Sequence, residues 1–428
     1  MRILLTGASG FIGRHLAVAL RARGHVVFEA ARAKPRRESL QGMPRGPDFN
    51  VDFAHDVEPS QWLPRVSGMD AVINTVGIFR EQRGQTFQTV HVEAASALFR
   101  ACVSAGVRRV IQFSALGADA GARTPYHLSK RRADELLAAL PLDWTIVQPS
   151  LVFGAEGASA AAFLALGSLP LIPLPGAGEQ QLQPVYIEDL AAGVAALLDS
   201  AEFRHRIVPF VGPHPISLKR YLADLRCGLG LPKARFVHVP VFWIRLAAQS
   251  GKLTRSSLLT PDSLQMLLRG NTADPGPLQQ LLGREARATS TFIAPNEAPR
   301  LRTEAQLFWL LPVLRISIAA VWIVTGIVSF GLFPVQSSYD LLARVGVPAA
   351  LRPLFLYSAA ALDIVLGLAI LLARRRRAWW LAQLALIALY TVLITVRMPE
   401  FWLHPYGPLS KNLPMLAGIY LLYRLEKR

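Results

Sequence analysis

Three residues in the first third of the chain have the types and spacing needed to move a proton at a carbonyl oxygen. Ser114 ends a predicted strand over residues 109–114, and Tyr126 and Lys130 open a predicted helix four residues apart, so they share one helix face. The Lys130 ammonium would lower the pKa of the Tyr126 phenol, which would exchange a proton with a carbonyl oxygen that Ser114 also hydrogen-bonds. The same Tyr-x-x-x-Lys spacing occurs on ordinary surface helices, so further elements must position these groups.

A glycine-rich turn at the start of the chain is the first such element. An apolar strand over residues 2–5 is followed by Thr-Gly-Ala-Ser-Gly-Phe-Ile-Gly at 6–13 and then by a helical pattern. Gly7 permits the tight turn, Gly10 lets the backbone approach a pyrophosphate, and Gly13 lets helix and strand pack closely. The free N–H groups at the helix start would bind the phosphates. We therefore expect a dinucleotide here, bound also by Ser9, Phe11 and Ile12.

The second predicted strand, residues 25–31, indicates which dinucleotide binds. An NAD site normally carries an acidic residue at the end of this strand to hydrogen-bond the ribose 2′-OH. Here Glu29 falls within the strand, and the chain continues with Arg32 and Lys34. Arg32 could pair with a 2′-phosphate, so NADP is favoured, while NAD stays possible. Alternatively, these cations face solvent or lipid head groups.

Further strand ends are predicted to border the same ligand. Asp52 and Phe53 could flank the adenine. Residues 70–77 form another predicted apolar strand, and its final part contains Asn74 and Gly77. Strands that alternate with helical stretches predict an α/β fold, a Rossmann-type doubly wound parallel sheet that binds its ligand at the carboxyl ends of the strands.

Together these motifs resemble the short-chain dehydrogenase/reductase superfamily. The details are similar to its extended and atypical branches, namely NAD-dependent epimerase/dehydratase-like proteins, NmrA-like proteins and the NADPH-binding accessory subunit of respiratory complex I. Stretches 148–154 and 183–191 support the resemblance, which covers residues 1–295, with a nucleotide part at about 1–150 and a substrate part at about 151–295. It implies catalytic roles for Ser114, Tyr126 and Lys130 and a cofactor contact at Pro149. In atypical branches the nucleotide can instead be structural or a redox sensor.

Two positions depart from the family pattern. Gln148 stands where the family often has Arg, and His91 stands where extended members often have Asn. We interpret His91 as a packed histidine rather than a replacement polar group. Both departures weaken the case for sugar-nucleotide epimerisation more than the case for cofactor binding.

The last third of the chain has the composition of a membrane domain. Three runs of about 20 residues, 316–339, 353–373 and 378–396, are almost free of charge and long enough to span a bilayer. A shorter run at 413–423 is a fourth candidate. Residues 374–377 are four arginines, and the positive-inside rule places this loop in the cytoplasm. Because the C-terminus is also basic, an even number of spans is favoured, with both the N-terminal domain and the C-terminus cytoplasmic. We expect a linker at 296–307 and an all-α four-helix transmembrane bundle at 308–428. The bundle is expected in the inner (plasma) membrane. The alternative is a buried helical bundle in a soluble protein.

The stretch 404–414 and the run pattern around it resemble the DoxX-like family of small four-helix membrane proteins, over residues 308–425. Relatives of that family are linked to thiosulfate or quinone redox chemistry. Asp363 lies within the second run, where a charge is costly and is a functional-site hypothesis by default, with Arg315 as a candidate partner. A packing role for a protonated Asp363 is the alternative. Arg397 and Lys411 fall on the predicted outer side and could bind an anion or a lipid head group.

Composition limits the remaining possibilities. With 52% hydrophobic and 18% charged residues, the chain is neither disordered nor typical of a wholly soluble protein. The net charge of +17 fits an anionic membrane surface. The sequence has no basic run interleaved with aromatic residues of the kind that binds nucleic acid. Two cysteines give no disulfide framework, and no Cys/His cluster has the spacing of metal ligands.

Three functions remain open on the sequence. The first is a membrane-anchored oxidoreductase that uses NADPH to reduce a lipophilic carbonyl or quinone. The second is a non-catalytic NADPH-binding structural or redox-sensing subunit that has protein partners in a respiratory complex. The third is a sugar-nucleotide epimerase or dehydratase.

Overall fold

The computed structural model describes residues 1–32, 49–249, 260–405 and 407–426, together with the backbone of Ser250. Lys34 and Tyr406, which belong to the basic run and to the 404–414 stretch, lie outside these residues. The chain divides into two compact units, Met1–Ala305 and Gln306–Arg428, and each is described by itself.

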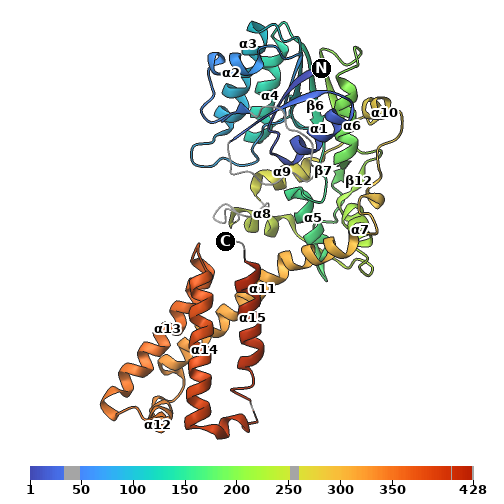
Figure 1. The fold of residues 1–428 in the computed structure, drawn as a ribbon. Coiled ribbons are helices and arrows are strands. Elements are labelled where there is room, and N and C mark those ends of the chain that lie inside the picture. The colour runs from blue at the N-terminus through green and yellow to red at the C-terminus, as the bar shows by residue number, and fades with distance from the viewer. Residues whose placement is uncertain (33–48, 251–259, 406, 427–428) are drawn as a thin grey trace. The chain divides into compact units, whose positions relative to one another are not determined.

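The first unit is built on a seven-stranded parallel sheet in the order β11-β6-β5-β4-β1-β2-β3 (Figure 1). Leu4 of β1 lies opposite Phe28 of β2 and Val72 of β4. From β1 the chain first adds strands on one side and then returns to add them on the other, which places a topological switch point beside β1, where such sheets bind ligands. The predicted Rossmann-type sheet is confirmed. Its strands are β1 (Arg2–Thr6), β2 (Val26–Ala31), β3 (Phe49–Asn50), β4 (Ala71–Asn74), β5 (Arg109–Phe113), β6 (Asp143–Pro149) and β11 (Arg206–Phe210).

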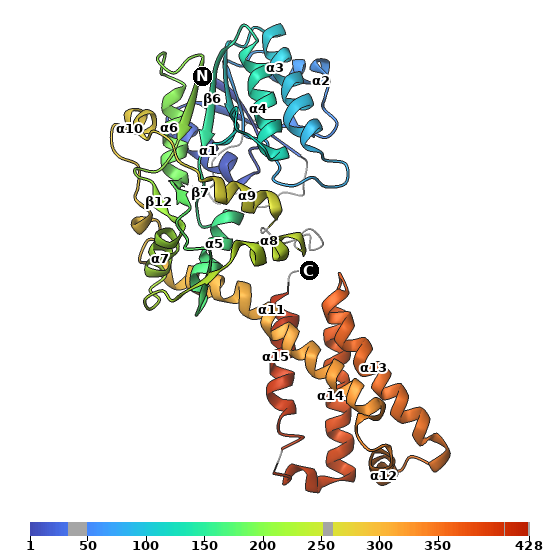
Figure 2. The ribbon, with the colours of Figure 1, turned by 180° about the vertical axis from the view of Figure 1, so that it is seen from behind.

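Helices cover both faces of this sheet (Figures 1 and 2). On one face, α1 and α6 pack through Leu16, Leu20 and Leu190 against the sheet residues Ile3 and Leu5. On the other face, α2, α3 and α4 form a second core around the buried Trp62 and Phe99. Because both faces are covered, the strands are apolar throughout rather than alternating. The covering helices are α1 (Phe11–Ala22), α2 (Pro59–Val66), η1 (Gln88–Glu93), α3 (Ala94–Ser104), α4 (Pro125–Ala138) and α6 (Ile187–Leu197).

The rest of the first unit builds a third core outside the sheet. Leu164 of α5 and Tyr221 of α7 meet Ile172 of β8, which pairs in parallel with β13. The remaining elements are β7 (Val152–Phe153), α5 (Ala158–Ser168), β8 (Ile172–Pro175), β9 (Gln181–Leu182), β10 (Val185–Tyr186), β12 (Ile216–Ser217), α7 (Leu218–Gly228), β13 (Phe236–Val239), α8 (Val241–Ser250), α9 (Pro261–Arg269), α10 (Gly276–Leu282) and η2 (Thr289–Thr291).

The second unit is a bundle of long apolar helices. Three segments of the described chain, Ala298–Leu332, Ala349–Leu372 and Arg377–Arg397, are long and apolar enough to cross a membrane. The fourth predicted helix is present as α15, but its 14 residues extend only about 21 Å at roughly 1.5 Å per residue. The stretch expected as a linker, 296–307, lies mostly in the first turns of α11. The elements are α11 (Ala298–Ile327, of which residues 298–305 belong to the first unit), η3 (Val328–Leu332), α12 (Val335–Val345), η4 (Ala349–Leu351), α13 (Arg352–Leu372), α14 (Arg377–Arg397), η5 (Pro399–Trp402) and α15 (Asn412–Leu425).

The expected pairing of Arg315 with Asp363 is wrong. Arg315 Nη2 lies 2.6 Å from Glu426 Oε1, and the other oxygen of Glu426 accepts a hydrogen bond from Trp380 Nε1 at 2.8 Å. The reason is the register of α11 and α13. A Cβ on Gly367 would lie 2.9 Å from the Ala319 carbonyl oxygen, and a Cβ on Gly326 would lie 2.7 Å from the Ala360 carbonyl oxygen, so the two helices run antiparallel with residue 319 beside 367. Arg315 therefore lies near the end of α13, while Asp363 lies in its middle.

Replacing Gly13 tests the packing of α1 on the turn before it. A Cβ at this position would lie 2.2 Å from the Gly7 carbonyl oxygen, a backbone atom that cannot move aside. We expect Gly13→Ala to lower the unfolding free energy by about 1–3 kcal/mol, the usual cost of overpacking. The measurement is the unfolding midpoint of the full-length protein in detergent. Val18→Ala on the exposed face of the same helix is the control, and an equal loss in both variants would contradict this explanation.

Candidate functional site

The glycine turn between β1 and α1 has a backbone that only glycine can follow. Gly7 has a φ of +75°, and a Cβ there would lie 2.5 Å from Thr75 Oγ1. Around a Cβ placed on Gly10, by contrast, the described structure has one close atom, the Gly7 carbonyl oxygen at 3.1 Å. The turn is thus tight at Gly7 and open at Gly10, where a ligand would approach the backbone.

The N-terminus of α1 has free hydrogen-bonding capacity. Its N-cap residue is Gly10, and no side chain caps the helix in the described structure. The first N–H groups of a helix have no partner within the helix, so they are available to a phosphate, which the helix dipole also favours. This observation fits the pyrophosphate of a dinucleotide.

A groove of about 180 Å³ extends from this turn along the carboxyl ends of β1, β2 and β4. It collects half of the predicted cofactor-binding residues: Gly7, Ser9, Gly10, Arg32, Asp52, Phe53 and Gly77. Residues that were not predicted also line it, among them Thr75, Val76, Ile78 and Gln85. The predicted residues could be identified because they follow the ends of predicted strands. Gln85 follows no strand, so the sequence carries no such signal for it.

The other predicted cofactor-binding residues do not line this groove: Phe11, Ile12, Gly13, Asn74, Tyr126, Lys130 and Pro149. Phe11 packs towards Gly154, Ile12 packs against the core, and the Pro149 carbonyl accepts a hydrogen bond from Leu116 N at 3.1 Å. Asn74 is 1% exposed, and it bonds Thr6 Oγ1 at 2.6 Å and Gln112 Oε1 at 2.8 Å. Asn74 therefore ties three strand ends together beneath the groove.

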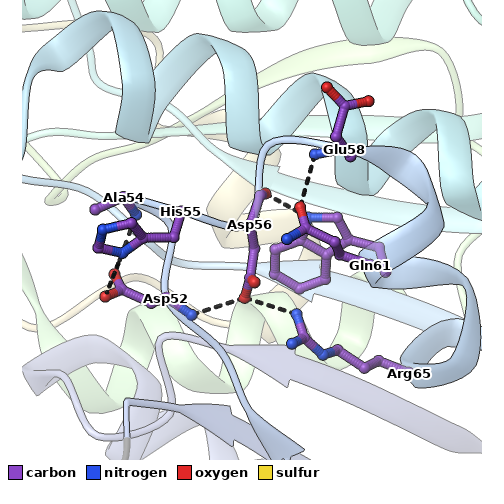
Figure 3. A network of polar contacts seen from close by, with 8 residues as sticks. Asp52, Ala54, His55, Asp56, Glu58, Gln61 and Arg65 are labelled. Carbon is purple, nitrogen blue, oxygen red and sulfur yellow. Dashed lines mark hydrogen bonds and ion pairs between the residues drawn. The ribbon is translucent and has the colours of Figure 1, made fainter.

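The segment after β3 is held by its own polar network (Figure 3). Asp52 accepts hydrogen bonds from Ala54 N at 3.0 Å and His55 Nδ1 at 3.1 Å. Asp56 Oδ2 accepts from Asp52 N at 2.8 Å and from Arg65 Nη1 at 2.6 Å. Partial burial works to raise the pKa of Asp52, but the bonds from Ala54 and His55 hold it below its usual value. The network fixes the wall of the groove to which Asp52 and Phe53 contribute.

Ser114 lies against a buried acid that the sequence analysis missed. Its hydroxyl donates a hydrogen bond to Oδ2 of Asp134, which is 4% exposed on α4. Burial raises the pKa of Asp134 to about 7, although the Ser114 bond and the Lys130 charge act in the opposite direction. Asp134 follows Lys130 by four residues and Tyr126 by eight, so helical spacing places all three on one face and could have identified it.

Lys130 is buried beside the same groups. Its Nζ donates to the carbonyl oxygens of Phe113 at 2.9 Å and Val76 at 3.2 Å, and a Cβ on Gly77 would lie 3.1 Å from it. The lack of a side chain at position 77 therefore makes room for the ammonium. Burial lowers the pKa of Lys130 to about 8, while the Asp134 carboxylate works to raise it.

Tyr126 is enclosed by aromatic rings. Phe79 stacks on it with ring centroids 4.7 Å apart, and Phe87 and His91 contact it edge-on. Burial, with a contribution from Asp134, raises the pKa of the phenol. This direction is opposite to the one expected from the Tyr-x-x-x-Lys spacing, because the spacing does not reveal how deeply the ring is enclosed. The phenol therefore keeps its proton over the neutral range, although a raised pKa also makes it a weaker acid.

His91 is a neutral, packed histidine with a defined tautomer. Ser129 donates its only hydroxyl proton to the Tyr126 carbonyl at 2.8 Å, so His91 Nδ1 must donate to Ser129 Oγ, 2.8 Å away. His91 Nε2 then accepts from Ile78 N at 2.9 Å. Burial and the nearby Lys130 lower the pKa of His91 to about 2. The ring orients the start of α4 and the segment after β4.

A second, larger cavity of about 650 Å³ lies between the start of α4 and helices α8 and α9. Its wall combines apolar residues such as Leu264 and Leu268 with the guanidinium groups of Arg123, Arg245 and Arg269. Arg269 is held in place by two 2.7 Å contacts to the Asp119 carboxylate. The cavity borders the helix that carries Tyr126, and its mixed lining would accept an apolar molecule with an acidic or polar group.

Comparison with known proteins divides the chain as the fold does. Residues 7–162 match the NAD(P)H-binding family model, and residues 319–420 match the DoxX-like family. The N-terminal match contains the glycine turn, Ser114, Tyr126 and Lys130, and the C-terminal match contains Asp363.

Curated relatives match about half of this chain. The mitochondrial NADH dehydrogenase [ubiquinone] 1 alpha subcomplex subunit 9 of Arabidopsis thaliana is 29% identical over 249 residues, 55% of this chain and 59% of that protein. The ceramide reductase of Caulobacter vibrioides is 26% identical over 196 residues, 45% of this chain and 60% of that protein. The chain thus spans about three fifths of the length of these relatives.

Solved structures share the fold of the first unit. A nucleoside-diphosphate-sugar epimerase from Staphylococcus aureus superimposes with a TM-score of 0.55 at 18% identity, over 68% of this chain and 99% of that one. The NADPH-dependent quinone oxidoreductase of Escherichia coli, complexed with NADPH, gives 0.54 at 17%, over 68% and 98%. The chain therefore joins an NAD(P)H-binding Rossmann domain, with epimerase-like and reductase-like neighbours, to a DoxX-like membrane domain.

Proposed function

We propose that the protein is a membrane-anchored oxidoreductase that uses NADPH to reduce a lipophilic carbonyl compound or quinone. The observation that carries the proposal is the cluster of proton-bearing groups, Ser114, Tyr126, Lys130 and Asp134, around the strand ends next to the dinucleotide groove. A site that only bound the nucleotide would not require a buried carboxyl group, that of Asp134, hydrogen-bonded to Ser114.

The cofactor choice rests on Arg32. This guanidinium lines the groove where β2 ends, and the described part of the groove has no acidic side chain at that strand end. A bidentate guanidinium pairs well with the 2′-phosphate of NADP, and NAD offers no such group. The turn residues Gly7, Ser9 and Gly10 would hold the pyrophosphate.

The lipophilic substrate is inferred from the membrane domain and from the relatives. A DoxX-like domain on the same chain keeps the reductase domain at a bilayer, where apolar substrates concentrate. One relative is a ceramide reductase, and a solved structure with this fold is a quinone oxidoreductase. The 650 Å³ cavity beside α4 is large enough for the polar end of such a molecule.

The residues of the chain would divide the chemistry as follows. Bound NADPH supplies a hydride to the substrate. Tyr126, which keeps its proton, donates it to the substrate oxygen, and Lys130 positions the nucleotide ribose. When Asp134 is protonated it donates to Ser114 Oγ, which frees the Ser114 proton for the same substrate oxygen. In this proposal the helical bundle lies in the inner (plasma) membrane. The first unit and the C-terminus face the cytoplasm, which supplies the NADPH.

A second candidate function is a non-catalytic NADPH-binding subunit of a respiratory complex. The relative named as a subunit of NADH dehydrogenase supports it. So does the site itself, since Lys130 Nζ donates to two backbone carbonyls and Phe79 covers the Tyr126 ring. This candidate predicts tight nucleotide binding, protein partners that co-purify, and no turnover.

The first test follows NADPH absorbance after a panel of quinones and lipophilic carbonyl compounds is added to the full-length protein in detergent. We expect oxidation that is lost in Gly10→Asp, because a carboxylate at the open side of the turn would repel the pyrophosphate. Gly10→Ala is the milder control. In Tyr126→Phe, activity should fall at least about 100-fold if the phenol is the acid, the usual contribution of general acid catalysis. Binding without oxidation of any compound would favour the non-catalytic candidate.

A second test concerns the 2′-phosphate. We expect Arg32→Ala to raise the Kd for NADPH about tenfold to a hundredfold, since a charge-assisted hydrogen bond contributes roughly 1.5–3 kcal/mol. The Kd for NADH should stay almost unchanged. Calorimetric titration of both nucleotides provides the measurement, and Arg131→Ala, an exposed guanidinium on α4, is the control. Equal losses for both nucleotides would show that Arg32 does not contact the 2′-phosphate.

A third test uses the raised pKa of Asp134. Because only the protonated acid frees the Ser114 proton, kcat/KM should fall as pH rises through about 7. In Asp134→Asn the amide can donate to Ser114 at every pH, so this decrease should disappear. Glu135→Gln removes a neighbouring exposed carboxylate whose charge contributes to the raised pKa of Asp134, so it should move the decrease to lower pH without abolishing it. An unchanged pH profile in Asp134→Asn would remove Asp134 from the proton path.

A further inference from the structure

Five side-chain polar atoms in the described part of the second unit are buried without a hydrogen-bond partner. Two of them, Arg315 Nε and Arg376 Nε, belong to guanidinium groups that pair with Glu426. The other three belong to side chains that form no ion pair in the described residues. They are Trp322 Nε1 on α11, Asp363 Oδ1 on α13 and Gln383 Oε1 on α14. Their residues are 6%, 9% and 0% exposed. An unpaired polar group in an apolar interior is costly, and buried groups of this kind call for an explanation such as a bound ion, water or proton.

The three groups belong to one level of the bundle. A Cβ on Gly367 would lie 2.9 Å from the Ala319 oxygen, and a Cβ on Gly326 would lie 2.7 Å from the Ala360 oxygen. These two close approaches define the crossing of α11 and α13. Trp322 lies between residues 319 and 326, and Asp363 lies between residues 360 and 367. Each has the three- and four-residue spacing that keeps it on the face of the crossing.

Gln383 reaches the same level from the third helix. Its Nε2 donates to the Leu366 carbonyl at 3.4 Å, one turn from Asp363 on α13. Its Oε1 is the atom left unpaired. The crossing of α11 and α13, with α14 beside it, therefore combines one unpaired donor, the indole N–H, with two unpaired oxygens.

One proton on Asp363 would give all three unpaired atoms a hydrogen-bond partner. An ionised Asp363 has only acceptors, so it could pair with the Trp322 N–H but would leave Gln383 Oε1 without a donor. A protonated Asp363 has one donor and one free acceptor. It can donate to Gln383 Oε1 and accept from Trp322 Nε1, directly or through one water.

The surroundings also favour the neutral acid. No ion pair to Asp363 is present in the described residues of the bundle, and Tyr390 on α14 is the titratable group that interacts with it. The charged cluster of Arg315, Arg376 and Glu426 begins about 12 Å along α13, because Arg315 lies opposite residue 371, eight residues beyond Asp363 at roughly 1.5 Å each. The groups that α12 and the start of α13 contribute at the other end are Tyr339, Asp340, Arg344, Arg352 and Tyr357. Arg344 pairs with Glu400, Arg352 donates to the Val347 carbonyl, and Tyr339 interacts with Tyr357.

We propose that Asp363 is a proton-binding site within the membrane bundle, where the carboxyl group takes up and releases a proton that Gln383 and Trp322 stabilise. On uptake the proton binds one carboxylate oxygen, and on release it returns to water without any redox change. The site does not depend on the reductase function proposed above, because all three residues lie in the second unit.

Dicyclohexylcarbodiimide tests the proposal, since this apolar reagent modifies protonated carboxyl groups. The full-length protein in lipid nanodiscs would be treated over a range of pH, and the modified residue would be located by mass spectrometry. We expect an adduct on Asp363 that decreases as pH rises and is absent in Asp363→Asn. Asp340→Asn should leave the adduct unchanged. Failure to label Asp363 at any pH, or labelling that does not change with pH, would overturn the proposal.

Two further measurements keep the test independent of how one variant folds. In the unmodified protein, the infrared carbonyl stretch of a protonated carboxyl group should appear and disappear with the pH dependence of the adduct. Gln383→Leu removes the acceptor of the proton, so several-fold less Asp363 should be labelled at a given pH. Gln336→Leu on α12 is the matched control. A Gln383→Leu protein that folds and labels like wild type would show that Gln383 does not stabilise the proton.

Discussion

A buried polar chain at the carboxyl ends of three strands determines the shape of the candidate site. Thr6 Oγ1 bonds Asn74, Asn74 bonds Gln112, and the Phe113 carbonyl accepts from both Gln112 and Lys130. Each bond is made in the interior, where a missing partner leaves a costly unsatisfied group. This series of hydrogen bonds therefore fixes where β1, β4 and β5 end relative to one another. The glycine turn, Gly77 and Ser114 directly follow these strand ends, so their positions depend on it.

This arrangement also explains which parts of the site the sequence could predict. The glycine turn, Arg32, Asp52 and Gly77 follow strand ends, and in a parallel sheet all such positions meet at one edge. Local pattern is sufficient for them. The direction of the Tyr126 pKa depends instead on Phe79, Phe87 and His91, which reach the ring from a segment that has no strand signal. Asp134 had the right helical spacing, but its importance appears only once Ser114 is known to face it.

The membrane domain shows the same division. Length and hydropathy predicted its long helices, because a bilayer imposes both on any spanning helix. The sequence could not show that Arg315 lies away from Asp363, since that depends on how far α11 is shifted along α13. That shift is fixed by the contacts of Gly326 and Gly367, which allow the two backbones to approach closely. Small residues in apolar runs indicate that helices pack closely, but they do not indicate which residues pair.

Two buried carboxyl groups illustrate how different surroundings give one side chain different chemistry. Asp134 has a serine donor and a lysine ammonium nearby, so its ionised form is partly compensated and its proton can be shared with a neighbour. Asp363 has no cation partner in the described bundle, and its neighbours offer one N–H and one carbonyl oxygen. The first environment balances the charged and neutral forms, whereas the second matches the hydrogen bonds of the neutral acid alone. A substitution that only removes the charge, Asp to Asn, therefore has different meanings at the two positions: at Asp134 it fixes one of two working states, and at Asp363 it removes the exchangeable proton itself.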